Sequence, residues 1–455
     1  MNRKSRKITL VGAGLNGPLL AVLLAQRGFA VEIYERRPDM RRVQISAGRS
    51  INLAISTRGI YALQRAGLWE QMRNIIIPMR GRMMHSPTGE LTFQPYGKDE
   101  CEVINSISRA DLNVALLNAA EEQGVKIHFQ QRCTGYDLKT GTLRLRNSET
   151  GKEQTAIPEV VIGCDGSASA MRSAMLKLNR FNFSQQHLDY GYKELTIPAG
   201  PEGEHRIEVH ALHIWPRGNY MLIALPNIDG TFACILFLPF EGADSFAQLA
   251  TPEDVSGFFA NHFPDVVPLM PQLADHYFAN PTGTMVTIKC SPWHVAGKAL
   301  LLGDAAHAIV PFFGQGINCG FEDCTCLAEI LDRHGEDWPR VFEEFEHQRK
   351  VNTDAIADMA IENFVEMRDR VADPRFLFRK KVELALEAKY PGFFVPKYAM
   401  VTFHRVPYSV ALARGAAQER ILAQVCDSID RVENLDWNKA EQLVRRELTP
   451  LEDLQ

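Results

Sequence analysis

The first forty residues show a pattern of hydrophobic and polar positions that predicts a strand, a helix and a second strand. An apolar run from Lys7 to Val11 leads through a glycine-rich turn into an apolar segment that ends near Gln26. Gly28 suits a helix C-terminal cap, and the residues from Ala30 to Tyr34 predict the second strand. This order is typical of a parallel sheet covered by helices.

Later parts of the chain show two other patterns. Alternating apolar residues in Tyr220–Pro226 and Thr231–Pro239, joined by Asn227–Gly230, predict an antiparallel hairpin with Asp-Gly in its turn. Helical periodicity dominates from about Gly335 onward, and it begins with a long helix from Trp338 to about Val371. We therefore expect two kinds of sheet and a helical C-terminal region.

Composition and charge place the chain among globular proteins. With 455 residues, 45% hydrophobic and 23% charged, it is long enough for two or three domains. The net charge of -5 gives no general attraction to nucleic acid or anionic membranes. Glycines and Pro18 interrupt the apolar run after the basic N-terminus, no later run reaches the roughly 18 apolar residues that cross a bilayer, and residues 414–455 are strongly charged. We predict a soluble protein without a membrane anchor.

The nine cysteines predict neither a disulfide framework nor a zinc site. Only Cys324 and Cys326 are closely spaced, and no second pair or nearby histidines stand in metal-ligand register. An odd number of cysteines without a framework suits a reducing compartment, so we predict a cytoplasmic protein.

The turn after the first strand has the spacing of a dinucleotide-binding fingerprint. It consists of Gly12, Ala13, Gly14, Leu15, Asn16 and Gly17. In such a fingerprint Gly12 makes the tight turn, Gly14 admits a pyrophosphate, and Gly17 lets helix and strand pack closely. Glu35 ends the second strand, where the fold places an acid for the adenosine ribose, and Arg36 follows it. The pattern predicts a dinucleotide but does not distinguish NAD(P) from FAD.

A second segment, residues 157–172, has the form of a buried strand, a turn and a helix start. The turn is Asp165-Gly166, and the helix start carries Ser169 and Arg172. Small hydroxyl residues after an Asp-Gly turn suit a capped helix, so the pattern alone is compatible with a purely structural role. Its position between the fingerprint and the next motif favours a flavin site.

A third segment, Gly303–Asn318, combines an acidic turn, a Pro-Phe-Phe step and a glycine-flanked helix start. Asp304 can accept a hydrogen bond from a ribitol or ribose hydroxyl. The glycines let backbone N–H groups approach a phosphate or an anionic ring edge. The residues expected to face the cofactor at the helix start are Gln315, Gly316, Ile317 and Asn318.

In this order, the three motifs resemble those of the single-component FAD-dependent aromatic hydroxylases, the class A flavoprotein monooxygenases. No second glycine fingerprint stands in strand–helix context, which fits a family in which NAD(P)H visits the flavin without its own Rossmann domain. The resemblance implies tightly but non-covalently bound FAD and NADPH as co-substrate. It also places Ala54, Arg109 and Cys133 near the FAD. Ser108 and Asp111 suit a capping box, which would put Arg109 in the first turn of a helix to Glu122.

The fold class implied is α/β, with a Rossmann-like FAD-binding domain interleaved with an antiparallel-sheet substrate domain, plus a helical C-terminal region. The FAD-binding domain is expected to comprise residues 1–75, 101–177 and 291–335. The substrate domain is expected to comprise residues 76–100 and 178–290. Residues 336–455 would form the helical region and act as a lid over the active site.

Several longer segments resemble one branch of this family, the kynurenine-hydroxylating enzymes. They are Gly48–Ser56 with Arg58-Gly59, Arg80–His85, Phe93–Gly97, Tyr192–Leu195, His213–Arg217, Val310–Asn318 and Phe321–Asp323. The resemblance implies L-kynurenine as the substrate, whose carboxylate Arg82 and Tyr96 would bind. Asn363 and Tyr398 would complete the polar end. The predicted apolar lining is Ile223, Phe237, Pro311 and Phe312. Phe313 stands where some members have histidine, so that histidine's role is not carried over.

The reaction implied is hydroxylation of L-kynurenine to 3-hydroxy-L-kynurenine, in tryptophan degradation and quinolinate-dependent NAD synthesis. By the resemblance, NADPH reduces FAD, oxygen adds at flavin C4a, and the hydroperoxide hydroxylates the ring ortho to the amino group. Because that amine already activates the ring, we predict no catalytic acid or base from the protein and no metal. His307 is interpreted as a packed structural histidine. The oligomeric state, monomer or homodimer, stays open.

Two other functions stay open from the residues alone. A class A hydroxylase for another small aromatic substrate would have no reason to keep a carboxylate-binding pair. A non-catalytic flavoprotein that senses redox state through Cys324 and Cys326 would bind FAD without substrate-dependent oxygen consumption. Flavin halogenases share the fold, but the chain lacks their W-x-W-x-I-P signature.

Overall fold

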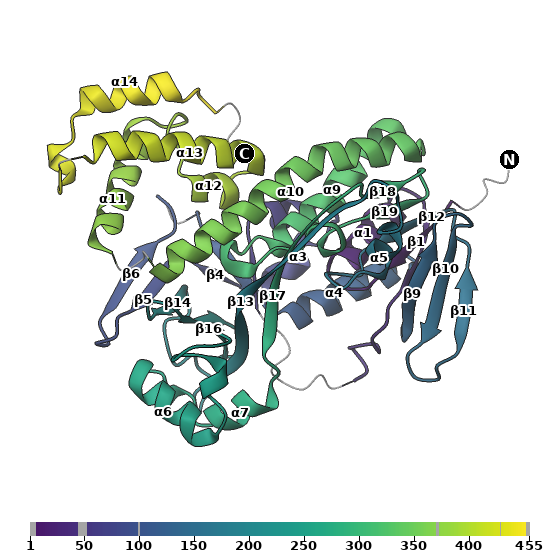
Figure 1. Ribbon diagram of the computed structural model, residues 1–455, viewed down its shortest axis with the longest axis horizontal. Coiled ribbons are helices and arrows are strands. Elements are labelled where there is room, and N and C mark those ends of the chain that lie inside the picture. The colour runs from purple at the N-terminus through teal and green to yellow at the C-terminus, as the bar shows by residue number, and fades with distance from the viewer. Residues whose placement is uncertain (1–5, 44–51, 99–100, 370–372, 428, 452–455) are drawn as a thin grey trace. The chain divides into compact units, whose positions relative to one another are not determined.

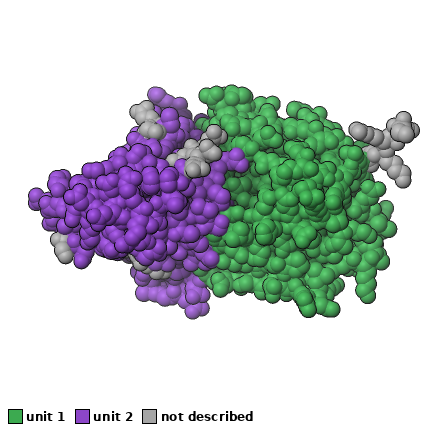
Figure 2. Space-filling view, turned by 90° about the horizontal axis from the view of Figure 1, so that it is seen from above, with its two compact units in different colours: residues 1–76, 106–188, 283–357 green, residues 77–105, 189–282, 358–455 purple. Residues whose placement is uncertain are grey.

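The computed structural model describes residues 6–43, 52–98, 101–369, 373–427 and 429–451. The chain divides into two compact units, shown in separate colours in Figure 2. Unit 1 comprises residues 1–76, 106–188 and 283–357, and unit 2 comprises residues 77–105, 189–282 and 358–455. Gly48–Ile51, part of a family-like segment, lie outside the described residues.

The main sheet of unit 1 has six strands in the order β18-β19-β12-β1-β2-β8 (Figure 1). Their bounds are β1 Lys7–Val11, β2 Ala30–Tyr34, β8 Lys126–His128, β12 Val160–Gly163, β18 His294–Val295 and β19 Ala299–Leu301. Neighbouring strands are parallel except for β18 and β19. Strands such as β12 are fully buried and apolar, as expected for a parallel sheet with both faces covered.

Helices of unit 1 share one hydrophobic core with this sheet. At its centre α1 (Asn16–Ala25) contacts α4 (Arg109–Glu122) and α9 (Gly316–His334). The other helices are α2 Thr57–Arg65, α3 Trp69–Met72, η1 Arg73–Ile75, α5 Ala170–Met175, α8 Asp304–His307 and η4 Pro311–Phe313. A small antiparallel sheet, β11-β10-β9, contacts α5 through β9. Further strands of unit 1 are β3 Leu53–Ile55, β9 Gln131–Asp137, β10 Thr142–Asn147, β11 Glu153–Ala156 and β17 Gly283–Ser291. Strands β4 Ile76–Met79 and β7 Ile104–Ile107 each contain residues of both units.

Unit 2 is built on strands in the order β13-β16-β15-β14-β5-β6. Their bounds are β5 Gly81–His85, β6 Leu91–Pro95, β13 Asn182–Ile197, β14 Ala211–Pro216, β15 Met221–Pro226 and β16 Phe232–Pro239. All pairs are antiparallel except β14 with β5. One face of this sheet packs on α6 (Pro252–His262) and α7 (Leu273–Ala279), with η2 Phe246–Gln248 and η3 Val267–Leu269 nearby in sequence. The opposite face is therefore left for other contacts.

The C-terminal part of unit 2 is helical. Its elements are α10 Trp338–Asp369, which begins in unit 1, α11 Pro374–Lys389, α12 Lys397–Thr402, α13 Tyr408–Val425, η5 Val432–Asn434 and α14 Trp437–Glu447. Helices α11, α13 and α14 form a hydrophobic core of their own around Val382, Ile421 and Val444. Among the described residues, none of the helices combines the length and apolar content that crossing a bilayer requires.

The structure confirms the α/β fold class, and the first strand and second strand have the predicted bounds. The hairpin is also confirmed, with Gly230 at φ +83° in its turn. Strand β8 ends at His128, and Cys133 lies inside the next strand, β9. Residues 336–357 belong to unit 1, because Val341, Phe342 and Phe345 pack into its core.

Candidate functional site

Close backbone contacts shape the glycine turn after β1. Gly12 has φ +102°, and a Cβ there would collide with the carbonyl oxygen of Cys164. A Cβ at Gly17 would collide with the carbonyl oxygen of Gly12, so α1 begins directly against the turn. Gly14, by contrast, has open space on its Cβ side. The first and third glycines therefore serve the fold, and the second leaves room beside the turn.

Asn16, the first residue of α1, connects this turn to the third motif. A Cβ at Gly303 or Gly320 would collide with its side-chain amide, so both glycines are needed where Asn16 packs. Leu15 beside it is buried. The side chain of Asn16 thus holds the α8 turn and α9 against α1.

Glu35, at the end of β2, is held by the protein itself. Its Oε2 accepts from the N–H of Ala13 at 2.7 Å, and its Oε1 accepts from the backbone N–H and Nε of Arg37 at 2.9 and 2.8 Å. Burial raises the pKa of Glu35, but the charge of Arg37 and these hydrogen bonds outweigh burial and lower it. Glu35 is therefore an ionised acceptor.

A cavity of about 300 Å³ lies beside the glycine turn within unit 1. Besides Gly12 and Gly14, six predicted cofactor residues line it: Glu35, Arg36, Arg109, Cys133, Asp165 and Asp304. Arg36 and Arg109 are exposed and supply positive charge. Burial raises the pKa of the Cys133 thiol to about 12, so it is neutral. Cations, an ionised acid and an accessible glycine backbone suit a ligand with both phosphates and hydroxyls.

Arg109 reaches this cavity from the first turn of α4. Ser108 caps that helix by accepting from the N–H of Asp111 at 3.3 Å. The predicted helix bounds are confirmed, since α4 runs from Arg109 to Glu122. The sequence therefore located Arg109 correctly on its element.

The Asp165 segment mainly builds the cavity wall. Oδ1 of Asp165 accepts from the hydroxyl of Ser169 at 2.6 Å, and Oδ2 accepts from the N–H of Ala170 at 2.7 Å. Ser169 caps α5, and Nη1 of Arg172 donates to the carbonyl of Ala305 at 2.8 Å. Burial raises the pKa of Asp165. The segment thus fastens β12 to α5 and to α8.

The start of α9 is fastened by the side chain of Asn318. Its Oδ1 accepts from the N–H of Ser56 at 2.9 Å, and its Nδ2 donates to the carbonyls of Ala54 and Gly314, both at 2.9 Å. Gln315 adds a hydrogen bond to the hydroxyl of Ser56 at 3.4 Å. The oxygen and the nitrogen of the Asn318 amide are both hydrogen-bonded within the protein, so a cofactor contact here would use backbone groups. The remaining predicted residues of this helix start are Gly316 and Ile317, and Ile317 is buried.

Asp304 lies on α8, where Ala305, Ala306 and His307 are buried and Asp304 is the exposed member that lines the cavity. The surrounding protein raises its pKa by desolvation, against the opposing charges of Arg109 and His307. The predicted acid of the third motif therefore faces the same cavity as the glycine fingerprint.

A buried charge network, which sequence reasoning missed, lies behind α8. We define it as Arg58, His307, Glu322, Asp323 and Arg349. Arg349 donates to Asp323 Oδ1 at 2.7 Å and to Glu322 Oε2 at 2.5 Å, and Arg58 pairs with the other oxygen of Glu322. Burial alone would lower the pKa of His307, but Asp323 outweighs it and raises this pKa to about 10. Two adjacent acids, Glu322 and Asp323, in the mainly apolar first half of α9 were the available signal.

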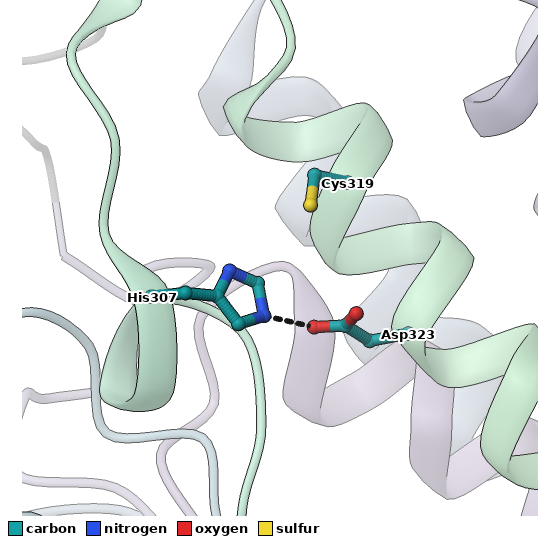
Figure 3. A group of neighbouring side chains, drawn as sticks. All are labelled: His307, Cys319 and Asp323. Carbon is teal, nitrogen blue, oxygen red and sulfur yellow. Dashed lines mark hydrogen bonds and ion pairs between the residues drawn. The ribbon is translucent and has the colours of Figure 1, made fainter. Parts of the chain in front are cut away.

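Three members of this region, His307, Cys319 and Asp323, stand close enough to suggest a metal site (Figure 3). Asp323 is already occupied, because Oδ2 accepts from His307 Nε2 at 2.6 Å and Oδ1 accepts from Arg349. A histidine with a pKa of about 10 is protonated at neutral pH and cannot offer Nε2 to a metal. His307 and Asp323 therefore serve the charge network, and Cys319 borders it by accepting from Nη2 of Arg349 at 3.4 Å.

In unit 2, Arg82, Tyr96 and Tyr398 form a cluster that we call the carboxylate clamp. The guanidinium of Arg82 lies 5.5 Å from the ring centre of Tyr96 and 5.2 Å from that of Tyr398. The two rings are stacked, with centres 5.7 Å apart and an interplanar angle of 13°. The Nε of Arg82 and the hydroxyl of Tyr96 are buried without a hydrogen-bond partner among the described residues. Buried donors in this state favour a bound acceptor.

Strand register puts three predicted substrate residues on one face of the unit 2 sheet. Arg82 pairs with Leu212, and Ile214, two residues on, pairs with Ile223. Phe237 pairs with Met221, which precedes Ile223 by two residues. Side chains two apart share a face, so Arg82, Ile223 and Phe237 lie opposite the face that packs on α6 and α7.

The other predicted substrate residues lie on helices. Asn363 is buried on the unit 2 part of α10. Pro311 is exposed and Phe312 is buried in η4, within unit 1. The structure thus brings Arg82, Tyr96 and Tyr398 together, and it places Pro311 and Phe312 in the other unit.

The covered face of the unit 2 sheet holds a histidine pair from two family-like segments. Nδ1 of His85 lies 3.0 Å from Asp265, Nε2 of His85 lies 2.8 Å from Nδ1 of His213, and Nε2 of His213 lies 2.7 Å from the carbonyl of Glu208. Both ends of this chain are acceptors, and the pair supports the sheet on the face opposite the carboxylate clamp.

Comparison with known proteins agrees with this geometry. The FAD binding domain family model matches residues 6–360. A kynurenine 3-monooxygenase of Myxococcus xanthus is 54% identical over 97% of this chain and 96% of its own length. A kynurenine 3-monooxygenase of Flavobacterium psychrophilum is 47% identical, with 96% of each chain covered.

Solved structures show the same fold at low sequence identity. 2-Methyl-3-hydroxypyridine-5-carboxylic acid oxygenase is 19% identical with a TM-score of 0.66, covering 83% of this chain and 96% of that one. Klebsiella pneumoniae HpxO, complexed with FAD and uric acid, is 20% identical with a TM-score of 0.65, covering 93% and 96%. Fold, motifs and near full-length identity lead to one assignment: the chain belongs to the kynurenine 3-monooxygenase family of FAD-binding-domain proteins.

Proposed function

We propose that this protein is an FAD-dependent monooxygenase that hydroxylates L-kynurenine to 3-hydroxy-L-kynurenine with NADPH and O2. Near full-length identity to relatives of that name supports the activity. The observation that carries the substrate class is the carboxylate clamp, in which the Nε of Arg82 and the hydroxyl of Tyr96 are buried without hydrogen-bond partners among the described residues, beside the stacked rings of Tyr96 and Tyr398. Such a site suits an amino-acid carboxylate attached to an aromatic body.

The residues of the unit 1 cavity fit FAD. Gly14 would leave room for the pyrophosphate, Glu35 would accept from the adenosine ribose, and Asp304 would accept from the ribitol chain. Arg36 and Arg109 would offset the charge of the phosphates. The start of α9 at Gly316 would present backbone N–H groups to an anionic group. When bound, FAD supplies the redox chemistry that activates dioxygen.

For the substrate, we propose that Arg82 binds the carboxylate through its guanidinium and that Tyr96 donates a second hydrogen bond. Burial raises the pKa of Tyr96, so its hydroxyl stays protonated and remains a donor. Asn363 and Tyr398 would complete the polar end, and Ile223, Phe237, Pro311 and Phe312 would be the apolar contacts. In this proposal the protein binds, orients and excludes water, while the ring amine of the substrate provides the electronic activation.

We also propose that the protein works in the cytoplasm. All nine cysteines fall within the described residues, and each is a free thiol. A chain with this many unpaired thiols suits a reducing compartment.

A substrate assay with the purified flavoprotein tests the proposed function. L-Kynurenine and NADPH are added, and the product is identified by mass together with the yield of hydrogen peroxide. The expected result is 3-hydroxykynurenine formed in proportion to NADPH consumed. Substrate-stimulated peroxide without hydroxylated product would show that L-kynurenine is the wrong substrate, and a panel of other small aromatic acids would then identify the right one.

A further inference from the structure

Asp304 lies on a short helix, α8, whose orientation depends on contacts with its neighbours. Helix α8 has four residues, Asp304–His307, and Gly303 before it has φ +65°. A single turn contains too few internal hydrogen bonds to fix its own direction, so its neighbours must do so. Whatever holds α8 therefore sets where Asp304 points within the cavity.

One carboxylate oxygen holds both ends of this helix. Oδ2 of Asp323 accepts from the N–H of Gly303 at 3.1 Å. The same oxygen accepts from Nε2 of His307 at 2.6 Å, as Figure 3 shows. Gly303 is the N-cap of α8 and His307 is its last residue. The two hydrogen bonds converge on one atom, so α8 cannot turn about its axis without breaking at least one of them.

Asp323 is itself fixed. It is fully buried on α9, and its other oxygen accepts from Nε of Arg349 at 2.7 Å. Arg349 also binds Glu322, which Arg58 holds from the other side. Arg58, Glu322 and Arg349 thus fix Asp323 in place, and one oxygen of Asp323 joins α8 to this support, in addition to the hydrogen bond from Arg172 to the carbonyl of Ala305.

We propose that Asp323 is the positioning residue for Asp304, and that its two hydrogen bonds to α8 set how tightly the protein holds FAD. The proposal rests on the proposed function, in which Asp304 binds a hydroxyl of the cofactor. The high pKa of His307 supports it, since a protonated ring donates to Asp323 throughout the neutral range.

The test measures the dissociation constant of FAD for the apoprotein, by quenching of FAD fluorescence, in a double-mutant cycle. The variants are His307→Ala, His307→Gln, Asp304→Ala and the double variant of Asp304→Ala with His307→Ala. We expect His307→Ala to weaken FAD binding about tenfold, and glutamine, which keeps an N–H donor, to stay within about threefold of the wild type. In the Asp304→Ala background, His307→Ala should change the dissociation constant less than about twofold.

Equal weakening by His307→Ala in both backgrounds would overturn the proposal, because His307 would then act independently of Asp304. A glutamine variant as weak as the alanine variant would also overturn it. An unchanged dissociation constant in Asp304→Ala alone would instead show that the cofactor contact of Asp304 is wrong, and the positioning role would be lost with it. Asp323→Asn gives a second test, and its effect on FAD binding should likewise disappear in Asp304→Ala.

Discussion

Two buried polar clusters, one in each unit, differ in how far their groups are satisfied. In unit 1, Arg349, Asp323 and Glu322 satisfy one another, and the network ends on backbone and side-chain donors of α8. In the carboxylate clamp of unit 2, Arg82 and Tyr96 keep buried atoms without partners among the described residues. Because folded proteins rarely leave such groups unpaired, the first arrangement is typical of a frame and the second of a binding site.

A substitution in the buried charge network of unit 1 tests this comparison most strongly. Arg349→Met removes the cation shared by Asp323 and Glu322 and leaves buried carboxylates less well compensated. We expect a loss of about 3–5 kcal/mol in the free energy of unfolding, measured by urea denaturation of the apoprotein. Arg333→Met is the control: it removes an exposed ion pair between Arg333 on α9 and Glu344 on α10, and it should cost under about 1 kcal/mol. Similar losses in both variants would contradict the idea of a frame.

Removal of the clamp should spare the fold and remove function. Arg82→Ala should lower kcat/KM for L-kynurenine by about a hundredfold or more, since it deletes charge-assisted hydrogen bonds to a carboxylate. The FAD content and the unfolding midpoint should stay close to those of the wild type. Arg80→Ala, an exposed arginine two residues earlier, is the matched control. Normal kinetics in Arg82→Ala would remove the carboxylate assignment.

Within unit 2, the two faces of the sheet differ in the same way. The histidine pair on the face that packs on α6 and α7 is hydrogen-bonded, whereas the carboxylate clamp lies on the opposite face. Burial lowers the pKa of His213 from 6.5 to about 4, so the folded protein holds it neutral while the unfolded chain protonates it. The unfolding free energy should therefore fall as the pH drops from about 6.5 toward 4, by up to about 1.4 kcal/mol per pH unit. His213→Gln should flatten this part of the stability curve, recorded by urea denaturation at several pH values. A curve unchanged by the substitution would show that other groups cause the loss.

The smallest effect is expected in the glycine turn, where a substitution at Gly14 should change FAD binding but not the stability of the apoprotein. Gly14→Ala places a methyl group in the open space beside the cavity, so FAD binding should weaken about tenfold while the apoprotein unfolds at an unchanged temperature. Gly257→Ala, on α6 and also in open space, is the control and should leave FAD affinity unaltered. Equal FAD affinity in Gly14→Ala and the wild type would mean that this side of the turn does not face the cofactor.

The sequence predicted the elements whose signals are local. The glycine fingerprint, the Asp-Gly hairpin and the Ser108 cap each depend on a few adjacent residues, and each has the expected form in the structure. The charge network could not be predicted in the same way, because Arg58 and Arg349 are nearly 300 residues apart and meet only through Glu322. Asn318 shows a related limit: nothing in the local sequence indicated that its side-chain amide would be used in tertiary contacts with Ala54 and Ser56.

The alternation of the chain between its two units has a consequence for biosynthesis. Each unit is assembled from three separate stretches, and unit 1 is complete only at residue 357 and unit 2 only near the end of the chain. The ribosome has therefore released much of the polypeptide before either unit is complete, and strands β5 and β12 wait for their later partners β14 and β19. A protein of this topology should fold after synthesis rather than during it, and its dependence on chaperones should exceed that of a chain whose domains follow one another in sequence.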